Sequence, residues 1–195
     1  MTVRTDTREK ILSAADQLMR QRGFNGFSYQ DIAKPLGIRN AAVHYHFPTK
    51  ADLAVELVEG VRSMLHERTG DFMRDGGDAR GQLEAFFAFS LNECTCDHTV
   101  CPVGAIAADF FSLPEAVQDA GRRLLDDLVA WMTRVCEVGR EQGKFRFDGD
   151  AGGKAEEILA ALQGARQVAR FRGAATVHRI IDQIRRDLGL PTGRP

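Results

Sequence analysis

The chain has 195 residues, of which 44% are hydrophobic and 27% charged, a composition typical of a folded globular protein and not of a membrane-spanning or disordered one. No apolar run approaches the roughly 20 residues of a spanning helix, and the first residues lack the apolar core of a signal peptide, so a cytoplasmic protein is expected. The net charge of −1 is unevenly divided, because residues 1–50 hold 8 Lys+Arg against 4 Asp+Glu whereas residues 51–195 hold 18 against 23, which makes the N-terminal part the segment suited to a polyanion.

The first predicted helix covers residues 6–22 and carries apolar side chains at helical spacing. These side chains recur three or four positions apart and form one stripe: Ile11, Leu12, Ala15, Leu18 and Met19. Gly23 follows as a helix stop, since glycine readily adopts the left-handed backbone that ends many helices. Phe24 and Phe27 come next, and their bulk is expected to lie beneath the two short helices that follow.

Residues 28–47 have the spacing of a helix-turn-helix. Ser28 and Asp31 form an N-terminal capping pattern, and an apolar pair one turn apart follows them. Gly37 then supplies a left-handed turn between the two helices. Pro35 removes one amide donor late in the first helix, so this helix is expected to end early or to tighten there.

The second short helix is predicted to begin near Arg39 and to end at Pro48, with Val43 and Phe47 turned toward the interior. The residues on its outer faces are polar, aromatic or small, as expected of a helix that enters the major groove of DNA: Arg39, Asn40, Ala41, His44 and Tyr45. This pattern indicates a DNA-binding unit.

A long helix is predicted over residues 50–74, because Thr49 and Asp52 repeat the capping pattern. Lys50 lies in its first turn, where a helix N-terminus and a positive charge together suit a DNA phosphate. Apolar residues recur along it at a helical period: Leu53, Leu57, Val61 and Leu65. The run Asp-Gly-Gly-Asp at residues 75–78 then breaks the pattern.

The remainder of the chain has only helical patterns, and no strand pattern competes. The predicted helices cover about residues 79–93, 102–111, 114–142, 151–172 and 174–188. We therefore expect an all-α protein with a helix-turn-helix domain over residues 1–50 and a larger helical domain over residues 51–195.

Aromatic and flexible apolar side chains are abundant in the larger domain, where they form either a closed core or the lining of a cavity. Two glutamines of the helix predicted at 151–172 could add polar groups to such a cavity. The candidate lining is Leu65, Phe86, Phe89, Cys101, Phe110, Leu128, Trp131, Met132, Gln163 and Gln167.

The last two predicted helices combine small residues on one side with apolar bulk elsewhere, and small surfaces allow close helix approach. This pair either closes the core of the monomer or packs against its copy in a two-fold dimer through residues 151–188. A dimer would place two reading helices about 34–36 Å apart, at successive major grooves, and its operator would be a near-palindrome.

Cys94, Cys96 and Cys101 lie with His98 between two predicted helices, and three interpretations are open. They are structural thiols, or a redox or electrophile sensor in which Cys101 at a helix start is the reactive group, or zinc ligands. Zinc is disfavoured because Cys-x-Cys is tighter than the usual ligand spacing, so no metal site is predicted. Cys136 lies in a helical stripe and is expected in the core.

The N-terminal motifs resemble those of the tetracycline-repressor (TetR) family of one-component transcriptional regulators. The resemblance covers roughly residues 8–58 and is carried by Gly23-Phe24, Ile32-Ala33, Gly37-Ile38, Tyr45-His46-Phe47, Lys50 and Leu53. It implies that base edges are contacted by Asn40, Ala41 and His44. It implies that the phosphate backbone is held by Ser28, Tyr45, His46 and Lys50. Tyr29 and Arg39 complete the predicted DNA-binding set.

The resemblance further implies a repressor that binds a double-stranded operator as a homodimer and is released by a small-molecule inducer bound in residues 51–195. The alternative is a regulator that senses redox state or electrophiles through the three clustered cysteines. A third possibility, suggested by Pro35 and Ala42, is a helical ligand-binding or scaffold protein whose helix-turn-helix has lost its DNA-binding function. An enzyme with a Cys101 nucleophile and His98 or His178 as base is disfavoured, because no phosphate loop, carboxylate pair or two-histidine metal motif accompanies them. No cofactor and no membrane partner are expected.

Overall fold

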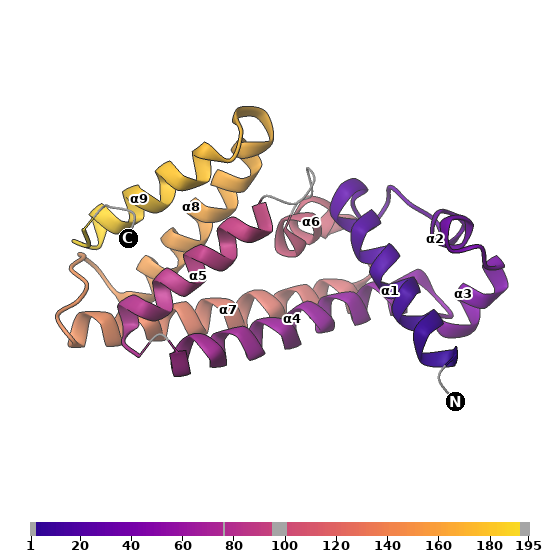
Figure 1. Cartoon of the computed structure of the whole chain (residues 1–195), viewed down its shortest axis with the longest axis horizontal. Helices are drawn as coiled ribbons and strands as arrows, with labels where there is room; N and C mark the ends of the chain where they lie inside the picture. The colour runs from indigo at the N-terminus through magenta and orange to yellow at the C-terminus, as the bar shows by residue number, and fades with distance from the viewer. Residues whose placement is uncertain (1–2, 76, 95–100, 192–195) are drawn as a thin grey trace. The chain divides into compact units, whose positions relative to one another are not determined.

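The computed structural model describes residues 3–75, 77–94 and 101–191, and every regular element in these residues is helical (Figure 1). In chain order the elements are α1 (Val3–Arg22), α2 (Tyr29–Leu36), α3 (Asn40–His46), α4 (Lys50–Asp75), α5 (Ala79–Cys94), α6 (Pro102–Asp109), η1 (Phe110–Ser112), α7 (Glu115–Glu141), α8 (Ala151–Arg172) and α9 (Ala175–Asp187). The predicted all-α class is confirmed, and each helix lies within a few residues of its predicted position.

The chain after α6 departs from the prediction. A single α-helix was expected over residues 102–111, but the α-helix ends at Asp109 and one 3₁₀ turn, η1, follows it. The Leu113 N–H donates to the Phe110 carbonyl at 3.2 Å, and Leu113 has the extended backbone (ψ 149°) that a following proline imposes. Pro114 therefore tightens and ends the helix before its predicted limit.

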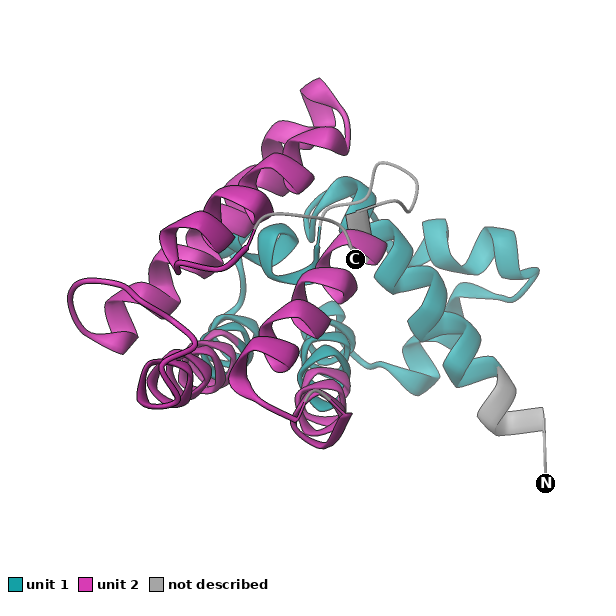
Figure 2. Cartoon of the chain, turned by 60° about the vertical axis from the view of Figure 1, so that its left-hand side comes forward, with its two compact units in different colours: residues 1–63, 99–124 teal, residues 64–98, 125–195 magenta. Residues whose placement is uncertain are grey.

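The chain divides into two compact units, coloured teal and magenta in Figure 2. Unit 1 comprises residues 1–63 and 99–124, and unit 2 comprises residues 64–98 and 125–195. Unit 1 contains α1, α2, α3 and α6, unit 2 contains α5, α8 and α9, and both α4 and α7 contribute residues to each unit. No helix within the described part of the chain is long and apolar enough to cross a membrane.

Unit 1 is stabilised by apolar side chains from α1 and the helix-turn-helix. Three residues of the predicted α1 stripe, Ile11, Ala15 and Met19, are buried, whereas Leu12 and Leu18 are only partly buried. Phe24 and Phe27 are 8% and 6% exposed, which confirms that they lie in the interior, and Val43 and Phe47 are 0% and 1% exposed. Because burial of one such side chain stabilises a fold by about 1.5–3 kcal/mol, these aromatic and branched residues hold α3 in a fixed orientation.

Unit 2 has a hydrophobic core of its own, which includes Leu83, Phe87, Met132, Ile158, Ile181 and Leu188. Cys136 is fully buried in it, as predicted, and desolvation raises the pKa of its thiol to about 11. Phe145 follows α7 and folds back against that helix. A β-carbon on Gly139 would lie 2.1 Å from the Phe145 ring, so this close approach requires glycine at position 139.

Candidate nucleic-acid interface

α2 and α3 form the predicted helix-turn-helix, and the turn between them begins at Gly37. Gly37 has φ 64°, and its N–H donates to the carbonyls of Ala33 and Lys34. The Ile38 N–H donates to the Ala33 carbonyl at 3.1 Å. This is the Schellman arrangement, in which a left-handed glycine lets two amides satisfy the last carbonyls of a helix.

Pro35 does not end α2 early, contrary to one form of the prediction, because the helix continues to Leu36. Proline at this late position removes only one intrahelical bond. The 3.3 Å bond from the Gly37 N–H to the Lys34 carbonyl spans three residues, which is the tighter form of helical bonding. The helix therefore tightens at its end and still delivers α3 from the predicted point.

The outward face of α3 is exposed to solvent. The five residues predicted there are all exposed in the structure: Arg39, Asn40, Ala41, His44 and Tyr45. Tyr45 is 66% exposed and its ring lies 5.3 Å from that of His46, edge to face. Val43 points inward with no exposed surface, so α3 has the amphipathic character of a reading helix.

Tyr29 braces the helix-turn-helix from within. It is 7% exposed, and its hydroxyl donates to the Phe47 carbonyl at 2.8 Å, which ties α2 to the end of α3. Burial, with a smaller contribution from the Asp52 carboxylate, raises the pKa of Tyr29 to about 12. The His44 ring lies 4.6 Å from the Tyr29 ring, and His44 Nδ1 is 3.3 Å from the Pro48 carbonyl oxygen. The side chain of His44 is therefore positioned by two contacts.

The Lys50 side chain is enclosed by residues of the turn between α1 and α2. Its ammonium donates to the carbonyl oxygens of Phe24 and Phe27 and lies 4.7 Å and 4.1 Å from the centroids of their rings. Burial lowers the pKa of Lys50, and the Asp31 and Asp109 carboxylates oppose that shift. Two of the three ammonium donors are thus used inside the protein, which leaves one for another acceptor.

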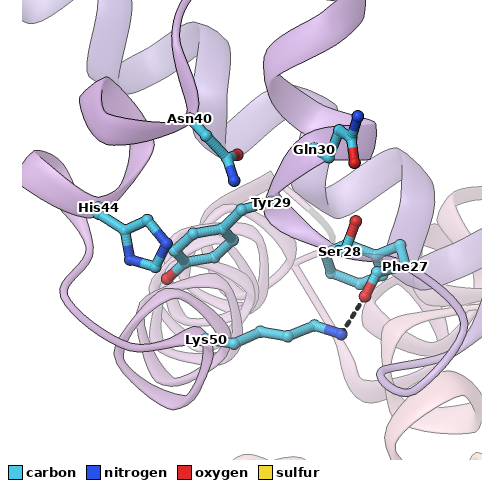
Figure 3. A pocket seen from close by; sticks show the side chains of 7 residues that line it. All are labelled: Phe27, Ser28, Tyr29, Gln30, Asn40, His44 and Lys50. Atoms are coloured by element: carbon cyan, nitrogen blue, oxygen red, sulfur yellow. Dashed lines mark hydrogen bonds between the residues drawn. The ribbon is translucent and has the colours of Figure 1, made fainter.

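These groups meet at an open hollow of about 430 Å³, drawn in Figure 3. Its lining residues are Phe27, Ser28, Tyr29, Gln30, Asn40, His44 and Lys50. Asn40 and His44 reach it from α3, Ser28 and Gln30 from the start of α2, and Lys50 from the start of α4 (Figure 3). The hollow brings together five of the predicted contacts and adds Gln30, which sequence reasoning missed although its place in the first turn of α2 was a usable signal. The other four predicted contacts, Arg39, Ala41, Tyr45 and His46, do not line it.

Two helix N-termini carry the predicted caps. At α2, the amide and the hydroxyl of Ser28 donate to Asp31 Oδ2 at 2.8 and 2.6 Å, and these bonds lower the pKa of Asp31. At α4, the Thr49 amide donates to Asp52 Oδ2 at 2.9 Å while the Asp52 amide donates to the Thr49 hydroxyl at 3.1 Å. The Asp31 and Leu53 amides donate to the carbonyls of Ser28 and Thr49 at 3.1 and 3.3 Å, and the amides that precede them have no carbonyl one turn earlier in their helices.

The turn that carries Phe24 is also fastened to α6 and η1. The Asn25 amide donates to Asp109 Oδ2 at 3.4 Å, and Asn25 Nδ2 donates to Ser112 Oγ at 2.8 Å. A β-carbon on Gly23, which has φ 74°, would lie 2.6 Å from the Asp109 carboxylate. This contact joins residues more than 80 positions apart, and it fixes the turn that holds Lys50.

The residues predicted to line a ligand cavity are divided between the two units. Cys101 and Phe110 belong to unit 1, and the other eight belong to unit 2. Within unit 2 the ring of Trp131 lies 5.2 Å from that of Phe86 and 6.0 Å from that of Phe72. Leu128 and Met132 are buried, whereas Gln167 is exposed. The cavity therefore stays a prediction.

Of the clustered cysteines, the structure describes the side chain of Cys101 alone. Cys101 is 8% exposed and caps α6, where its Sγ accepts from the Gly104 amide at 3.3 Å. The side chain of Cys94, together with Cys96 and His98, lies outside the described residues. Within the described part of the chain, no group of three His, Cys, Asp or Glu residues is placed to hold a metal ion.

Family models match both parts of the chain. The model for bacterial regulatory proteins of the tetR family matches residues 11–57, and the model for the tetracyclin repressor-like C-terminal domain matches residues 80–184. The HTH-type transcriptional repressor NemR of Escherichia coli (strain K12) is 26% identical over 170 residues, which is 85% of each chain. A crystal structure of E. coli NemR in its reduced form has a TM-score of 0.82 and 23% identity, and covers 96% of this chain and 100% of that one.

Two further solved structures are similar over nearly the whole chain. A TetR-family transcriptional regulator from Agrobacterium tumefaciens has a TM-score of 0.90 and 32% identity, covering 94% of this chain and 98% of that one. A transcriptional regulator from Saccharomonospora viridis, solved in complex with choline, has a TM-score of 0.77 and 24% identity, covering 94% and 95%. The helix-turn-helix geometry and these matches agree, and the chain belongs to the TetR family of bacterial transcription regulators.

Proposed function

We propose that the protein is a repressor that binds a near-palindromic operator as a dimer and releases it when a small molecule binds. The observation that carries this proposal is the exposed face of α3 beside a hollow lined by Lys50 and the start of α2. A projecting helix flanked by positive charge and unsatisfied helix amides suits a major groove and its adjacent phosphates. The NemR relative, itself a transcriptional repressor, favours repression over activation.

Base edges are proposed to be contacted by Arg39, Asn40, Ala41 and His44. The Asn40 amide can pair bidentately with adenine, and the Ala41 methyl suits the methyl group of thymine. Because His44 Nδ1 is engaged with the Pro48 carbonyl, its Nε2 is the nitrogen that remains for a base.

Phosphates are proposed to be held by Ser28, Tyr45, His46 and Lys50, with Tyr29 as the brace beneath them. Lys50 offers its third N–H, and the first-turn amides of α2 and α4 supply further donors. Gln30, at the edge of the same hollow, adds an amide group to this set. Each phosphate neutralised by a cation makes binding more sensitive to salt, so the operator complex is expected to weaken steeply as ionic strength rises.

The dimer is proposed to form through α8 and α9. The outer side of α8 is formed by exposed small and apolar residues: Ala160, Gly164, Val168 and Phe171. Phe171 is 90% exposed and Val168 is 43% exposed, which is unfavourable for an isolated subunit. Packing against the same stripe of a second copy would remove this surface from water and satisfy two-fold symmetry.

An inducer is proposed to act by binding the DNA-free conformation more tightly than the DNA-bound one. A differential affinity worth about 1–3 kcal/mol is enough for a useful switch. α4 begins beside the phosphate site and continues into unit 2, so a change in α4 would alter the position of Lys50. The choline complex of the S. viridis regulator supports a small-molecule site in this fold.

The test measures, by fluorescence anisotropy, how tightly the full-length protein binds DNA from upstream of its own coding sequence. Arg39→Ala is expected to weaken binding about tenfold or more, since a bidentate arginine–guanine contact contributes about 1–3 kcal/mol of discrimination. The matched control is Arg134→Ala, because Arg134 is exposed on α7 and its replacement by alanine removes the same charge. Equal affinities of the two variants would reject α3 as the reading helix.

A second candidate function is sensing of electrophiles or oxidants by the clustered cysteines Cys94, Cys96 and Cys101. The favouring observation is the position of Cys101, whose sulfur accepts an amide N–H at the start of α6, the helix that fastens the Phe24 turn. N-ethylmaleimide, to which a thiol adds with transfer of its proton to the adjacent carbon, is a direct probe. Sensing would be supported if this treatment abolishes operator binding by the unchanged protein while the Cys101→Ser variant still binds the operator after the same treatment. Unchanged binding after complete modification would reject it.

A further inference from the structure

Unit 2 contains three buried polar atoms that have no hydrogen-bond partner among the described residues. They are Ser90 Oγ on α5, Trp131 Nε1 on α7 and Arg166 Nε on α8. A buried donor left without an acceptor costs about 1–3 kcal/mol, more when it is charged, so native proteins rarely keep several in one region without use. All three belong to the magenta unit of Figure 2.

The residues that carry these atoms are linked through α5. Arg166 Nη2 donates to the Ser90 carbonyl oxygen at 3.4 Å, which places the guanidinium beside Ser90. Phe86 lies four residues before Ser90, on the same face of the helix, and its ring is 5.2 Å from that of Trp131. Arg166 is therefore next to Ser90, and Trp131 is next to the residue one turn before Ser90 on α5.

Arg166 differs from the other arginine that unit 2 holds mostly out of water. The side chain of Arg185, 17% exposed, forms ion pairs with both Glu84 and Asp182. Arg166 is partly buried, its Nε is fully buried, and no carboxylate among the described residues pairs with it. A partly buried guanidinium without an anion is a strong site for one, because its charge is poorly hydrated and poorly compensated.

Trp131 belongs to an aromatic cluster that packs against the core of unit 2. The Phe72 ring lies 6.4 Å from that of Phe89 and 6.0 Å from that of Trp131, and Phe86 completes the group. None of the three ring pairs is stacked face to face, since their planes are tilted by 51° to 56°. Such a group offers ring faces and edges to a flat apolar molecule.

We propose that the effector bound by unit 2 is a small carboxylate attached to a flat apolar body, with Arg166 as its anion-binding residue. Ser90 Oγ and Arg166 Nε donate to the carboxylate, and Trp131 Nε1 donates to a carboxylate or neighbouring oxygen of the same molecule. This inference rests on the proposed function, in that a small molecule regulates the protein, and it names the chemical class of that molecule. The part of the ligand that faces Trp131 and Arg166 must accept hydrogen bonds, since these two side chains can only donate.

Trp131 is the only tryptophan of the chain, so its emission reports on this place alone. The full-length protein is titrated with benzoate and with trans-cinnamate, and in parallel with benzamide and cinnamamide, which keep the shape and lose the charge. Saturable change of Trp131 emission by at least one carboxylate is expected, with its amide at least tenfold weaker. No saturable change with either carboxylate, or equal affinity for acid and amide, overturns the proposal.

Variants assign the anion to Arg166. Arg166→Gln is expected to weaken carboxylate binding at least tenfold, and Arg166→Lys, which keeps the charge, to weaken it less. Arg170→Gln removes the same charge from an exposed position one turn along α8 and is expected to leave binding unchanged. Should Arg166→Gln fail to fold by circular dichroism, Ser90→Ala and Arg166→Lys carry the test. If carboxylate affinity is unaltered in Arg166→Gln, or in both Ser90→Ala and Arg166→Lys when the glutamine variant does not fold, buried water satisfies the donors and the assignment is contradicted.

Operator binding, measured on the same samples, separates this inference from the function on which it rests. If the protein binds its operator and no carboxylate perturbs Trp131, the ligand class is wrong and the DNA-binding function stands. If a carboxylate binds through Arg166 and operator affinity does not change, the ligand class stands and ligand-controlled release is rejected.

Discussion

Replacing Lys50 by methionine separates a structural role from a DNA-binding role. In the structure the ammonium donates to the Phe24 and Phe27 carbonyls, and it lies over both rings. Methionine keeps much of the apolar stem, but it removes both hydrogen bonds and leaves two carbonyl oxygens without their donor. The variant is therefore expected to be less stable even when no DNA is present.

The magnitude follows from the contacts. A hydrogen bond to a charged group contributes about 1.5–3 kcal/mol, and a cation–π contact at a partly exposed site about 0.5–1 kcal/mol. The desolvation that lowers the pKa of Lys50 offsets part of this gain. Lys50→Met should thus reduce the free energy of unfolding by about 2–4 kcal/mol, which corresponds to a fall in Tm of roughly 4–16 °C for a chain of this length.

Urea unfolding followed by far-ultraviolet circular dichroism, at fixed protein concentration, measures the effect. The matched control is Lys34→Met, since Lys34 is an exposed lysine of α2, and its stability should stay within about 0.5 kcal/mol of the unchanged protein. The reasoning fails if Lys50→Met unfolds at the same urea concentration as the unchanged protein and loses only DNA affinity. Lys50 would then be a phosphate ligand and not a structural residue.

Three further outcomes are expected. Gly23→Ala should destabilise the protein by about 1–3 kcal/mol, because φ is 74° and the new β-carbon would lie 2.6 Å from the Asp109 carboxylate of α6. Gly60→Ala, in open space on α4, should stabilise the protein by up to about 1 kcal/mol, and thermal melts compare the two variants. Tyr29→Phe should lose about 1 kcal/mol in urea unfolding with its bond to the Phe47 carbonyl. Asp150 accepts the first-turn amide of α8, which lowers its folded pKa below the ordinary 3.8, so its contribution is present above pH 4 and is lost as pH falls through the folded pKa. Asp150→Asn should therefore flatten the acid side of the stability–pH curve, and an unchanged acid side would refute this.

Local patterns made much of the DNA-binding unit predictable. The caps at Ser28 and Thr49, the turn at Gly37 and the inward residues of α3 all depend on neighbours within a few positions, and the structure contains each of them. Sequence spacing could therefore place α2 and α3 almost to the residue.

Contacts between distant segments were not predictable. Nothing near Lys50 in sequence shows that its ammonium meets carbonyls 23 and 26 positions earlier. The bond from Asn25 to Asp109 spans 84 positions, and no spacing rule connects them. That Arg166 has no carboxylate partner among the described residues also becomes evident only when the helices of unit 2 are assembled, because no sequence pattern indicates which arginines form ion pairs.

The central claim is that two copies of the chain read two half-sites on successive turns of the same face of DNA. The most direct measurement is the affinity and stoichiometry of the full-length protein on its footprinted operator and on variants with about 5 or about 10 base pairs inserted between the half-sites, since one helical turn is about 10.5 base pairs. Two copies per operator, with affinity lost at the half-turn insertion, are predicted on this account. A single copy per operator, or equal affinity for the original and the half-turn insertion, would contradict it.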